Sequence, residues 1–406
     1  MKEMVSPAEA LALVLETIRS CGEETVSHNE SLGRVLARDV ISPVDLPPFR
    51  NSAMDGYAVR CADLQNATEN PVELPVSETI AAGQMPSRAL RPNECARIMT
   101  GAALPDNADA VVMREETEER GATTVFRTSP APDEFIRPQG HDIARGELAL
   151  SAGTLVRAAE WGMLASLEQR EVVVARRPRI ALIVTGDEVI PAPMPLQSGQ
   201  IRDSNSFTLR ALAQECGAEV ELFRVGDDAA QLRALFEQEG FDGFVTSGGI
   251  SAGDFDIVRD VLPQMGEIVF YRVAMKPGKP VMFAHLNGVP VWALPGNPVS
   301  VMVAFELFVR PALLQMQGRS APRLEVEAVV DGAHRSPQGK VEWVRARIVA
   351  EVRSIATVLV ARISGDQGSG RLSTMTQANA LLEIPADVTQ LNAGDRVRAR
   401  LLGTEI

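Results

Sequence analysis

The hydrophobic pattern of the first 58 residues predicts one helix followed by irregular chain. A Ser-x-x-Glu capping box spans Ser6 to Glu9, and Pro occupies the first helical position ahead of apolar residues at helical spacing. We therefore expect a helix that ends at Gly22. The segment 33–58 is rich in proline and turn residues, which favours an extended, loop-like chain.

Short β-favouring runs follow. Between Cys61 and Leu150, runs such as 108–113 and 123–126 alternate with glycine and proline turns, which predicts a small, mostly β domain. A helix is expected over 158–167.

Strand and helix patterns alternate from Arg179 onward. The expected order is RIALIVT as a strand, a helix near 206–216, the strand AEVELFRV, a helix near 229–238, the strand FDGFVTS, another helix and the strand EIVFYRVA. Such alternation predicts a parallel sheet with helices on both faces. A last helix after Pro298 contains Pro311, which should kink or split it.

The pattern changes again at Leu324. The segments LEVEAVV, VEWVRARIV, ATVLVARI, ALLEIP and RVRARLL are consecutive strand patterns separated by turns. They predict a small β-barrel or sandwich. The expected fold class is therefore multidomain α/β and β, with a central open α/β domain between β-rich parts.

Bulk properties narrow the possible partners. A chain of 406 residues exceeds one hydrophobic core, so two to four domains are expected. The net charge of -13 and the pI near 5.0 argue against a nucleic-acid or anionic-membrane surface. Any local cluster of lysine and arginine is therefore informative.

The cysteines and the apolar runs indicate the cellular compartment of the chain. The four cysteines are scattered without a CxxC pair, which is typical of a reduced cytoplasmic chain. We expect no signal peptide and no membrane span, since no apolar run reaches eighteen residues.

Loops after the expected strands carry the candidate chemistry. Val245 to Asp256 places two adjacent glycines between a strand and a helix start, where backbone N–H groups can approach an anion. Asp254 and Asp256 could hold Mg²⁺ against a phosphate. A strand-to-helix turn with an Asp cap explains the same residues and stays open.

Two further loops repeat this arrangement. Pro295 and Gly296 end a strand and Pro298 opens a helix that carries Ser300, although a capped helix with Pro at its first position is the simpler interpretation. In an acidic chain, Lys276 and Lys279 around a Pro-Gly turn suit oxyanion capture, and solvated turn lysines are the alternative.

Acidic residues follow the first two strands of the α/β domain. Asp187 and Glu188 come after the first, and Asp227 and Asp228 after the second, where helix capping is a simpler explanation. Convergence of four such loops on one sheet edge favours a ligand site.

The N-terminal half offers weaker signals. Asp55 lies in a tight turn that presents a carboxylate, and Thr100 is a hydroxyl ligand or a turn residue, the turn being preferred. Asp142 lies beside His141, and a lone surface histidine usually has no function.

The motifs together resemble the MoeA-type molybdopterin molybdenumtransferases, a family that includes the E domain of gephyrin. The matching strings, in family order, are NSAMDGYA, TGAALP, the Gly-x-Asp loop at Gly140, TGDEV, TSGGISAGD, KPGKP, PGNPVS and QGSG at 367–370. The loop often written Gly-Glu-Asp in the family is Gly-His-Asp here, with His141 in the place of the glutamate.

The resemblance implies a four-part subunit. Its expected parts are 1–44 with 143–177, an inserted β-rich domain 45–142, an α/β domain 178–321 similar to molybdopterin-adenylating proteins, and a C-terminal barrel 322–406. The implied reaction cleaves adenylylated molybdopterin with Mg²⁺, releases AMP and inserts molybdate, the co-substrate, to give molybdenum cofactor.

The resemblance also implies roles for individual residues. Acidic and hydroxyl residues of the catalytic set would be Asp55, Thr100, Asp142, Glu188, Asp227 and Asp256, of which Glu188, Asp227 and Asp256 would hold Mg²⁺. The pterin substrate would meet Ser247, Gly248, Gly249, Ser251, Pro295, Gly296, Asn297 and Pro298. Molybdate would meet Lys276, Lys279, Ser300, Arg345 and Ser369, since a tetraoxyanion needs cations and O–H or N–H donors.

The implied assembly is a cytoplasmic homodimer in which Asp55, Thr100 and Asp142 face the partner's α/β domain, with a possible contact to the molybdopterin adenylyltransferase.

Two rival functions remain. An adenylyltransferase acting on molybdopterin would fit the α/β domain alone, and a gephyrin-like scaffold would bind receptor peptides. The flanking domains argue against the first, and the lack of a fused adenylating domain argues against the second.

Overall fold

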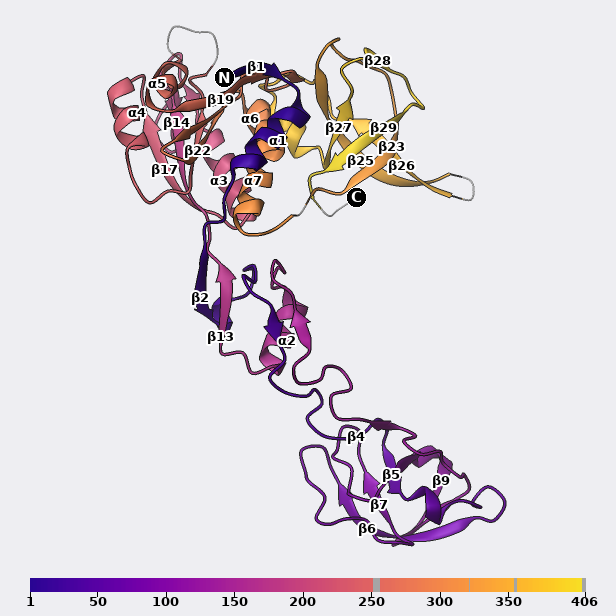
Figure 1. The fold of residues 1–406 in the computed structure, drawn as a ribbon. Coiled ribbons are helices and arrows are strands. Elements are labelled where there is room, and N and C mark those ends of the chain that lie inside the picture. The colour runs from indigo at the N-terminus through magenta and orange to yellow at the C-terminus, as the bar shows by residue number, and fades with distance from the viewer. Residues whose placement is uncertain (251–255, 321, 354–355, 404–406) are drawn as a thin grey trace. The chain divides into compact units, whose positions relative to one another are not determined.

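A computed structural model describes residues 1–250, 256–320, 322–353 and 356–403 (Figure 1). Two compact units are present. One comprises Met1–Thr25, Gly33–Ala37 and Val173–Ile406, and the other comprises Val26–Leu32 and Arg38–Val172. Strands β2 (Glu23–Ser27) and β13 (Glu171–Ala175), which form a two-stranded sheet, contain two of the four chain boundaries between them.

A seven-stranded sheet in the order β1-β19-β21-β22-β18-β14-β17 forms the centre of the first unit. Its strands are β1 (Lys2–Val5), β14 (Arg179–Thr185), β17 (Glu219–Val225), β18 (Gly243–Ser247), β19 (Glu267–Val273), β21 (Met282–Leu286) and β22 (Val289–Leu294). Four strands, β17, β14, β18 and β22, run parallel, so their carboxyl ends meet at one edge.

Helices cover both faces of this sheet, as predicted. Successive residues of β14 face opposite sides: Ile180 packs into a core with α1, α3 and the Pro298–Met316 helix, and Ala181 packs into a core with α4 and α5. The helices are α1 (Pro7–Thr17), α3 (Asn205–Glu215), α4 (Ala229–Phe236) and α5 (Ile257–Met265). Two small strands, β15 (Val189–Ile190) and β16 (Ile201–Arg202), pair beside the sheet.

Two expectations for this unit are wrong. The sheet is mixed, because β21 runs antiparallel to both β19 and β22, and a two-residue turn at Asn287 and Gly288 joins β21 to β22. Both turn residues have positive φ, as a tight hairpin requires. The first helix ends at Thr17 and not at Gly22, since Ile18 is already extended.

The helix after Pro298 is split, as predicted. It consists of α6 (Pro298–Ala304), the π-helical stretch η4 (Phe305–Val309) and α7 (Arg310–Met316), and Pro311 lies in the first turn of α7. Among the described residues it alone has the length and composition of a membrane span, but 78% of its most apolar window is buried inside the protein, as in a core helix.

The C-terminal strands close into a barrel. Pairings run from β25 through β26, β23, β29 and β27 back to β25, which leaves no free edge. The elements are β23 (Glu325–Val330), β24 (His334–Arg335), β25 (Val341–Arg353), β26 (Ala356–Ile363), α8 (Leu372–Thr376), β27 (Ala380–Ile384), β28 (Gln390–Leu391) and β29 (Arg396–Leu401). Strand β20 (Met275–Lys276) joins the barrel beside β25.

The second unit is mostly β, as predicted. Its main sheet has the order β8-β5-β7-β6-β10-β9. The elements of this unit are η1 (His28–Glu30), β3 (Val40–Ile41), β4 (Asn51–Ser52), β5 (Gly56–Val59), η2 (Cys61–Asp63), β6 (Val72–Ile80), β7 (Cys95–Ile98), β8 (Ala110–Met113), η3 (Arg114–Glu116), β9 (Thr117–Arg120), β10 (Thr123–Phe126), β11 (Ile136–Arg137), β12 (Leu148–Leu150) and α2 (Ala158–Ser166). The expected fold class is confirmed, and the four sets of domain bounds stay a prediction.

Candidate functional site

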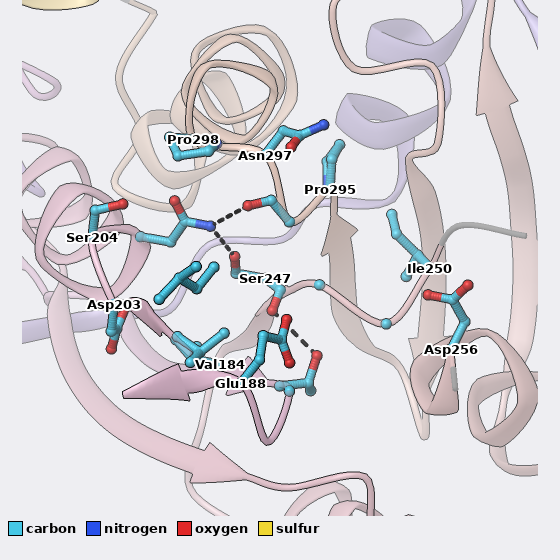
Figure 2. Close-up of a pocket in the computed structure, with 18 of the residues that line it drawn as sticks. Val184, Glu188, Asp203, Ser204, Ser247, Ile250, Asp256, Pro295, Asn297 and Pro298 are labelled. Atoms are coloured by element: carbon cyan, nitrogen blue, oxygen red, sulfur yellow. Dashed lines mark hydrogen bonds between the residues drawn. The ribbon is translucent and has the colours of Figure 1, made fainter. Parts of the chain in front are cut away.

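A cavity of about 610 Å³ opens at the carboxyl ends of β14, β18 and β22, where the sequence predicts a ligand. We call it the acidic cavity. Figure 2 shows Pro295, Asn297 and Pro298 across this cavity from Val184 and Glu188. The predicted residues that line it are Glu188, Asp227, Ser247, Gly248, Gly249, Asp256, Pro295, Gly296, Asn297 and Pro298. Ser251 and Asp254 lie outside the described residues.

The glycine turn after β18 packs closely against β14. Gly248 and Gly249 adopt φ of +95° and +69°, which side chains rarely allow. A Cβ on Gly248 would lie 2.9 Å from Thr185 Oγ1 and 3.3 Å from the Thr185 carbonyl oxygen. The backbone must therefore approach β14 closely here, and small residues keep the cavity floor open.

Carboxylates concentrate at one side of this cavity. Burial raises the pKa of Asp227, and repulsion from Asp187, Glu188 and Asp256 raises it further. Four acidic groups that repel one another favour a cation. In the described part of the chain, however, no three His, Cys, Asp or Glu side chains are close enough to form a complete metal cage.

The acidic pair after β17 divides into two roles. Asp228 caps α4, because its Oδ1 accepts hydrogen bonds from the N–H groups of Ala230 at 2.8 Å and Gln231 at 3.2 Å. Asp227 instead lines the cavity. The capping interpretation is confirmed for Asp228 alone.

The sequence analysis did not identify a group of residues at the start of α3. Asn205 is buried, and its Nδ2 donates to Ser247 Oγ at 2.8 Å and to the Gly296 carbonyl at 2.7 Å, which ties two cavity loops together. Asp203 is buried in the cavity wall and pairs with Arg224 at 3.0 Å. The only sequence signal is the polar run Asp203 to Ser206 before a helix.

A second cavity of about 480 Å³ adjoins the first. It is lined by Lys276, Lys279, Ser300, Lys340, Asp366 and Ser369, and we call it the lysine cavity. Pro280, Pro295 and Asn297 line both cavities. The structure thus brings together four of the five residues predicted for molybdate, while Lys340 is a residue that the sequence analysis did not single out.

A buried carboxylate anchors one lysine of this cavity. Glu342 on β25 is 1% exposed, and its two oxygens lie 2.8 Å from Lys276 Nζ and 2.9 Å from His334 Nε2. Burial acts to raise the pKa of Glu342, but the hydrogen bonds from His334 and Lys276 outweigh it and lower the pKa to about 2. Lys276 therefore has a fixed ionic partner.

Arg345, the fifth predicted residue, lies behind the cavity wall. Its side chain is 1% exposed, and it donates through Nη2 to the carbonyls of Asp366 at 3.3 Å and Gly368 at 3.0 Å, and through Nε to Thr374 Oγ1 at 3.2 Å. Burial lowers its pKa. Its observed contacts fix the loop that carries Ser369, and direct contact with molybdate stays a prediction.

Ser369 is in turn tied to the loop after β22. Asn297 Nδ2 donates to Ser369 Oγ at 3.1 Å, and the Val299 N–H donates to the Ser369 carbonyl at 3.1 Å. Asn297 occupies the N-cap of α6 but makes no capping bond with its side chain. This side chain therefore connects the helix start to the barrel loop.

The remaining predicted residues belong to the second unit. Asp55 and Thr100 lie together, since Asp55 Oδ1 accepts the Thr100 N–H and hydroxyl, both at 2.7 Å. These bonds lower the pKa of Asp55. Asp142 is exposed, and its N–H donates to the Leu46 carbonyl at 2.9 Å.

Three family models match nearly the whole chain. "MoeA N-terminal region (domain I and II)" matches residues 5–167, "Probable molybdopterin binding domain" matches 181–315, and "MoeA C-terminal region (domain IV)" matches 327–402. These are the three regions that the hydrophobic pattern of the sequence separates, with changes at Arg179 and Leu324.

Relatives and solved structures agree with these models. The chain is 38% identical to "Molybdopterin molybdenumtransferase 2" of Mycobacterium tuberculosis over 97% of this chain and 99% of that protein. It is 38% identical to a molybdopterin molybdenumtransferase of Nostoc sp. over 90% of this chain and 85% of that protein. A crystal structure of the molybdopterin biosynthesis MoeA protein of Pyrococcus horikoshii superposes with a TM-score of 0.83 at 30% identity, over 98% of this chain and 100% of that one. The chain therefore belongs to the MoeA family of molybdopterin molybdenumtransferases, enzymes of molybdenum cofactor biosynthesis.

Proposed function

We propose that this chain cleaves adenylylated molybdopterin, releases AMP and inserts molybdate into the pterin dithiolene. The observation that carries the proposal is the contact between the two cavities. Pro280, Pro295 and Asn297 line both, so a phosphate-bearing ligand in one cavity would lie beside an oxyanion in the other.

In this proposal the acidic cavity binds the nucleotide end of the substrate. The Gly248 N–H already donates to the Leu294 carbonyl at 3.1 Å, so the Gly249 N–H would be the donor to a phosphate, while Glu188, Asp227 and Asp256 would hold Mg²⁺. Mg²⁺ suits an incomplete cage, because it keeps several waters and commonly uses one or two carboxylates together with substrate phosphates. When bound, it would neutralise the phosphate charge that these carboxylates would otherwise repel.

The lysine cavity is the proposed molybdate site. Lys279 would supply charge, Ser300 and Ser369 would supply hydroxyl donors, and Lys276 would donate from the position that Glu342 fixes. None of the carboxylates that line the acidic cavity also lines the lysine cavity. The lysine cavity has one lining carboxylate of its own, Asp366, which forms an ion pair with Arg371 at 3.0 Å.

The proposed assembly is a cytoplasmic homodimer whose sites are shared. Asp55, Thr100 and Asp142 would then act from the partner subunit, and the adenylyltransferase that makes the substrate would contact the same face. The joint hydrogen bonding of Asp55 and Thr100 supports a local site in the second unit. The pairing of subunits is tested by the oligomeric state and by mixing two inactive variants, one altered in each unit, to restore activity.

The deciding experiment supplies the protein with adenylylated molybdopterin, Mg²⁺ and molybdate and follows AMP and metal-bound pterin. AMP release without ATP is the expected result. An adenylyltransferase would instead consume ATP and release pyrophosphate. No AMP above a protein-free control would refute the proposal.

A further inference from the structure

Lysine is scarce in this chain, and its placement is uneven. Of 40 lysine and arginine residues only four are lysines, namely Lys2, Lys276, Lys279 and Lys340. Three of these four line the lysine cavity. Arginine therefore serves almost everywhere else, and the compact, freely rotating ammonium is concentrated at one place.

The charges around the cavity leave two cations without a partner. Lys276 is neutralised by Glu342 at 2.8 Å, and Asp366 is neutralised by Arg371 at 3.0 Å. Within the ranges that the structure describes, neither Lys279 nor Lys340 forms an ion pair with a carboxylate. Among the side chains that line the cavity the net balance is two positive charges, which equals the charge of a dianionic tetraoxyanion with opposite sign, and the buried Arg345 behind the wall adds a further positive charge.

The backbone around Lys340 is fixed on both sides. The Gly339 N–H donates to the Ala386 carbonyl at 2.8 Å, and the Val341 N–H donates to the Ala274 carbonyl at 3.0 Å. The second bond ties the start of β25 to the chain just before Lys276. Lys340 is half-buried, so it differs from a lysine on a loose, solvated turn.

We propose that Lys340, on the barrel, is a further ligand of molybdate and completes the charge of the lysine cavity together with Lys279. This inference rests on the proposed function. It adds a cationic ligand just before β25 to the Ser369 hydroxyl that the proposed function already draws from the C-terminal part.

The test measures binding of molybdate alone to the full chain by equilibrium dialysis. Lys340→Gln should weaken binding about tenfold, since a charge-assisted hydrogen bond is lost, and Lys340→Arg should lose less because the charge stays. Lys2→Gln is the matched control: Lys2 pairs with Glu9 at 2.8 Å on the surface, and its removal should leave binding within about twofold. Thermal unfolding establishes that each variant is folded.

Activity provides a second measurement. Lys340→Gln should raise the KM for molybdate while AMP release at saturating molybdate stays near that of the wild type. Inorganic phosphate serves as a competing probe. If Lys340→Gln loses phosphate binding but binds molybdate as the wild type does, the assignment of Lys340 to molybdate is contradicted.

Different results would refute the proposed function and the role of Lys340. If the wild type neither binds molybdate nor releases AMP, the proposed function is refuted and this inference with it. If the wild type does both and Lys340→Gln binds molybdate as tightly, only the role of Lys340 is refuted.

Discussion

The acidic cavity and the lysine cavity share three lining residues but have opposite chemistry. The first gathers Glu188, Asp227 and Asp256 beside a glycine turn, whereas the second gathers three lysines. In the proposed function the first would need a cation before it accepts a phosphate, whereas the second would accept an oxyanion directly. Two anionic reactants can therefore be held side by side without sharing one set of ligands.

The cavities also differ in how their residues are held. Loops that follow parallel strands of one sheet build most of the acidic cavity, and Asn205 joins two of them. The lysine cavity is built between the sheet and the barrel, with Glu342 and Arg345 buried beneath it. The second cavity should consequently be the more sensitive to changes in buried charged groups.

The largest expected effect is that of Arg345→Ala. It removes a buried guanidinium and three hydrogen bonds, so the free energy of unfolding should fall by about 3–5 kcal/mol and molybdate binding should be lost with the Ser369 loop. Arg347→Ala, an exposed position on the same strand, should change stability by under about 0.5 kcal/mol. Equal stabilities of the two variants in denaturant unfolding would show that the buried guanidinium does not support the lysine cavity.

Glu342→Gln should come next, with an effect that depends on pH. The pKa of Glu342 falls from 4.5 to about 2 in the folded protein, so its ionised form contributes about 3 kcal/mol above pH 4.5. This contribution should disappear as the pH falls from about 4.5 to 2. The stability difference between wild type and variant, followed by denaturant unfolding across this range, should shrink accordingly.

The control for that series is Glu327→Gln, because Glu327 forms an exposed pair with Arg396. Its effect should be small at every pH. A Glu342→Gln difference that stays constant down to pH 2 would mean that the buried carboxylate does not hold a lowered pKa.

Asp227→Asn tests the acidic cavity alone. AMP release should fall roughly 10- to 100-fold and require more Mg²⁺, because a carboxylate of the proposed metal site is lost. Molybdate binding in the lysine cavity should not change. Since burial and repulsion from neighbouring carboxylates both raise the pKa of Asp227, the metal-free variant should be at least as stable as the wild type, and a clear loss of stability would contradict this.

The smallest effect on stability is expected for Asp55→Ala. Asp55 is exposed in the second unit, so the variant should stay folded with only a small loss of stability from its two hydrogen bonds with Thr100, while turnover slows. Molybdate binding should be kept. Full activity of this variant in the AMP assay would show that neither cavity needs this carboxylate, and Asp39→Ala is a control in the same unit.

Much of the fold could be predicted because its signals are local. The strands β14 and β18, the turns that follow them and the five barrel strands all follow from apolar runs bounded by turn residues. The antiparallel β21 was missed, although Asn287 and Gly288 are a strong hairpin signal.

The site was predicted less completely, for a physical reason. Gly248 and Asp227 stand at strand ends, where position along the chain indicates position in space. The contacts of Glu342 with Lys276, and of Arg345 with the Ser369 loop, join segments that are far apart in sequence and meet only through tertiary packing. A buried carboxylate that orients a lysine therefore leaves no local pattern.

The uneven use of lysine has a practical consequence for covalent chemistry. Acylating reagents modify primary amines and leave guanidinium groups untouched. Apart from the amino terminus, the chain offers such reagents four targets, and Lys279 and Lys340 are the two at the lysine cavity without a carboxylate partner among the described residues. Amine labelling should therefore act as a nearly background-free footprint of one cavity, with Lys2 as the internal standard on the same polypeptide.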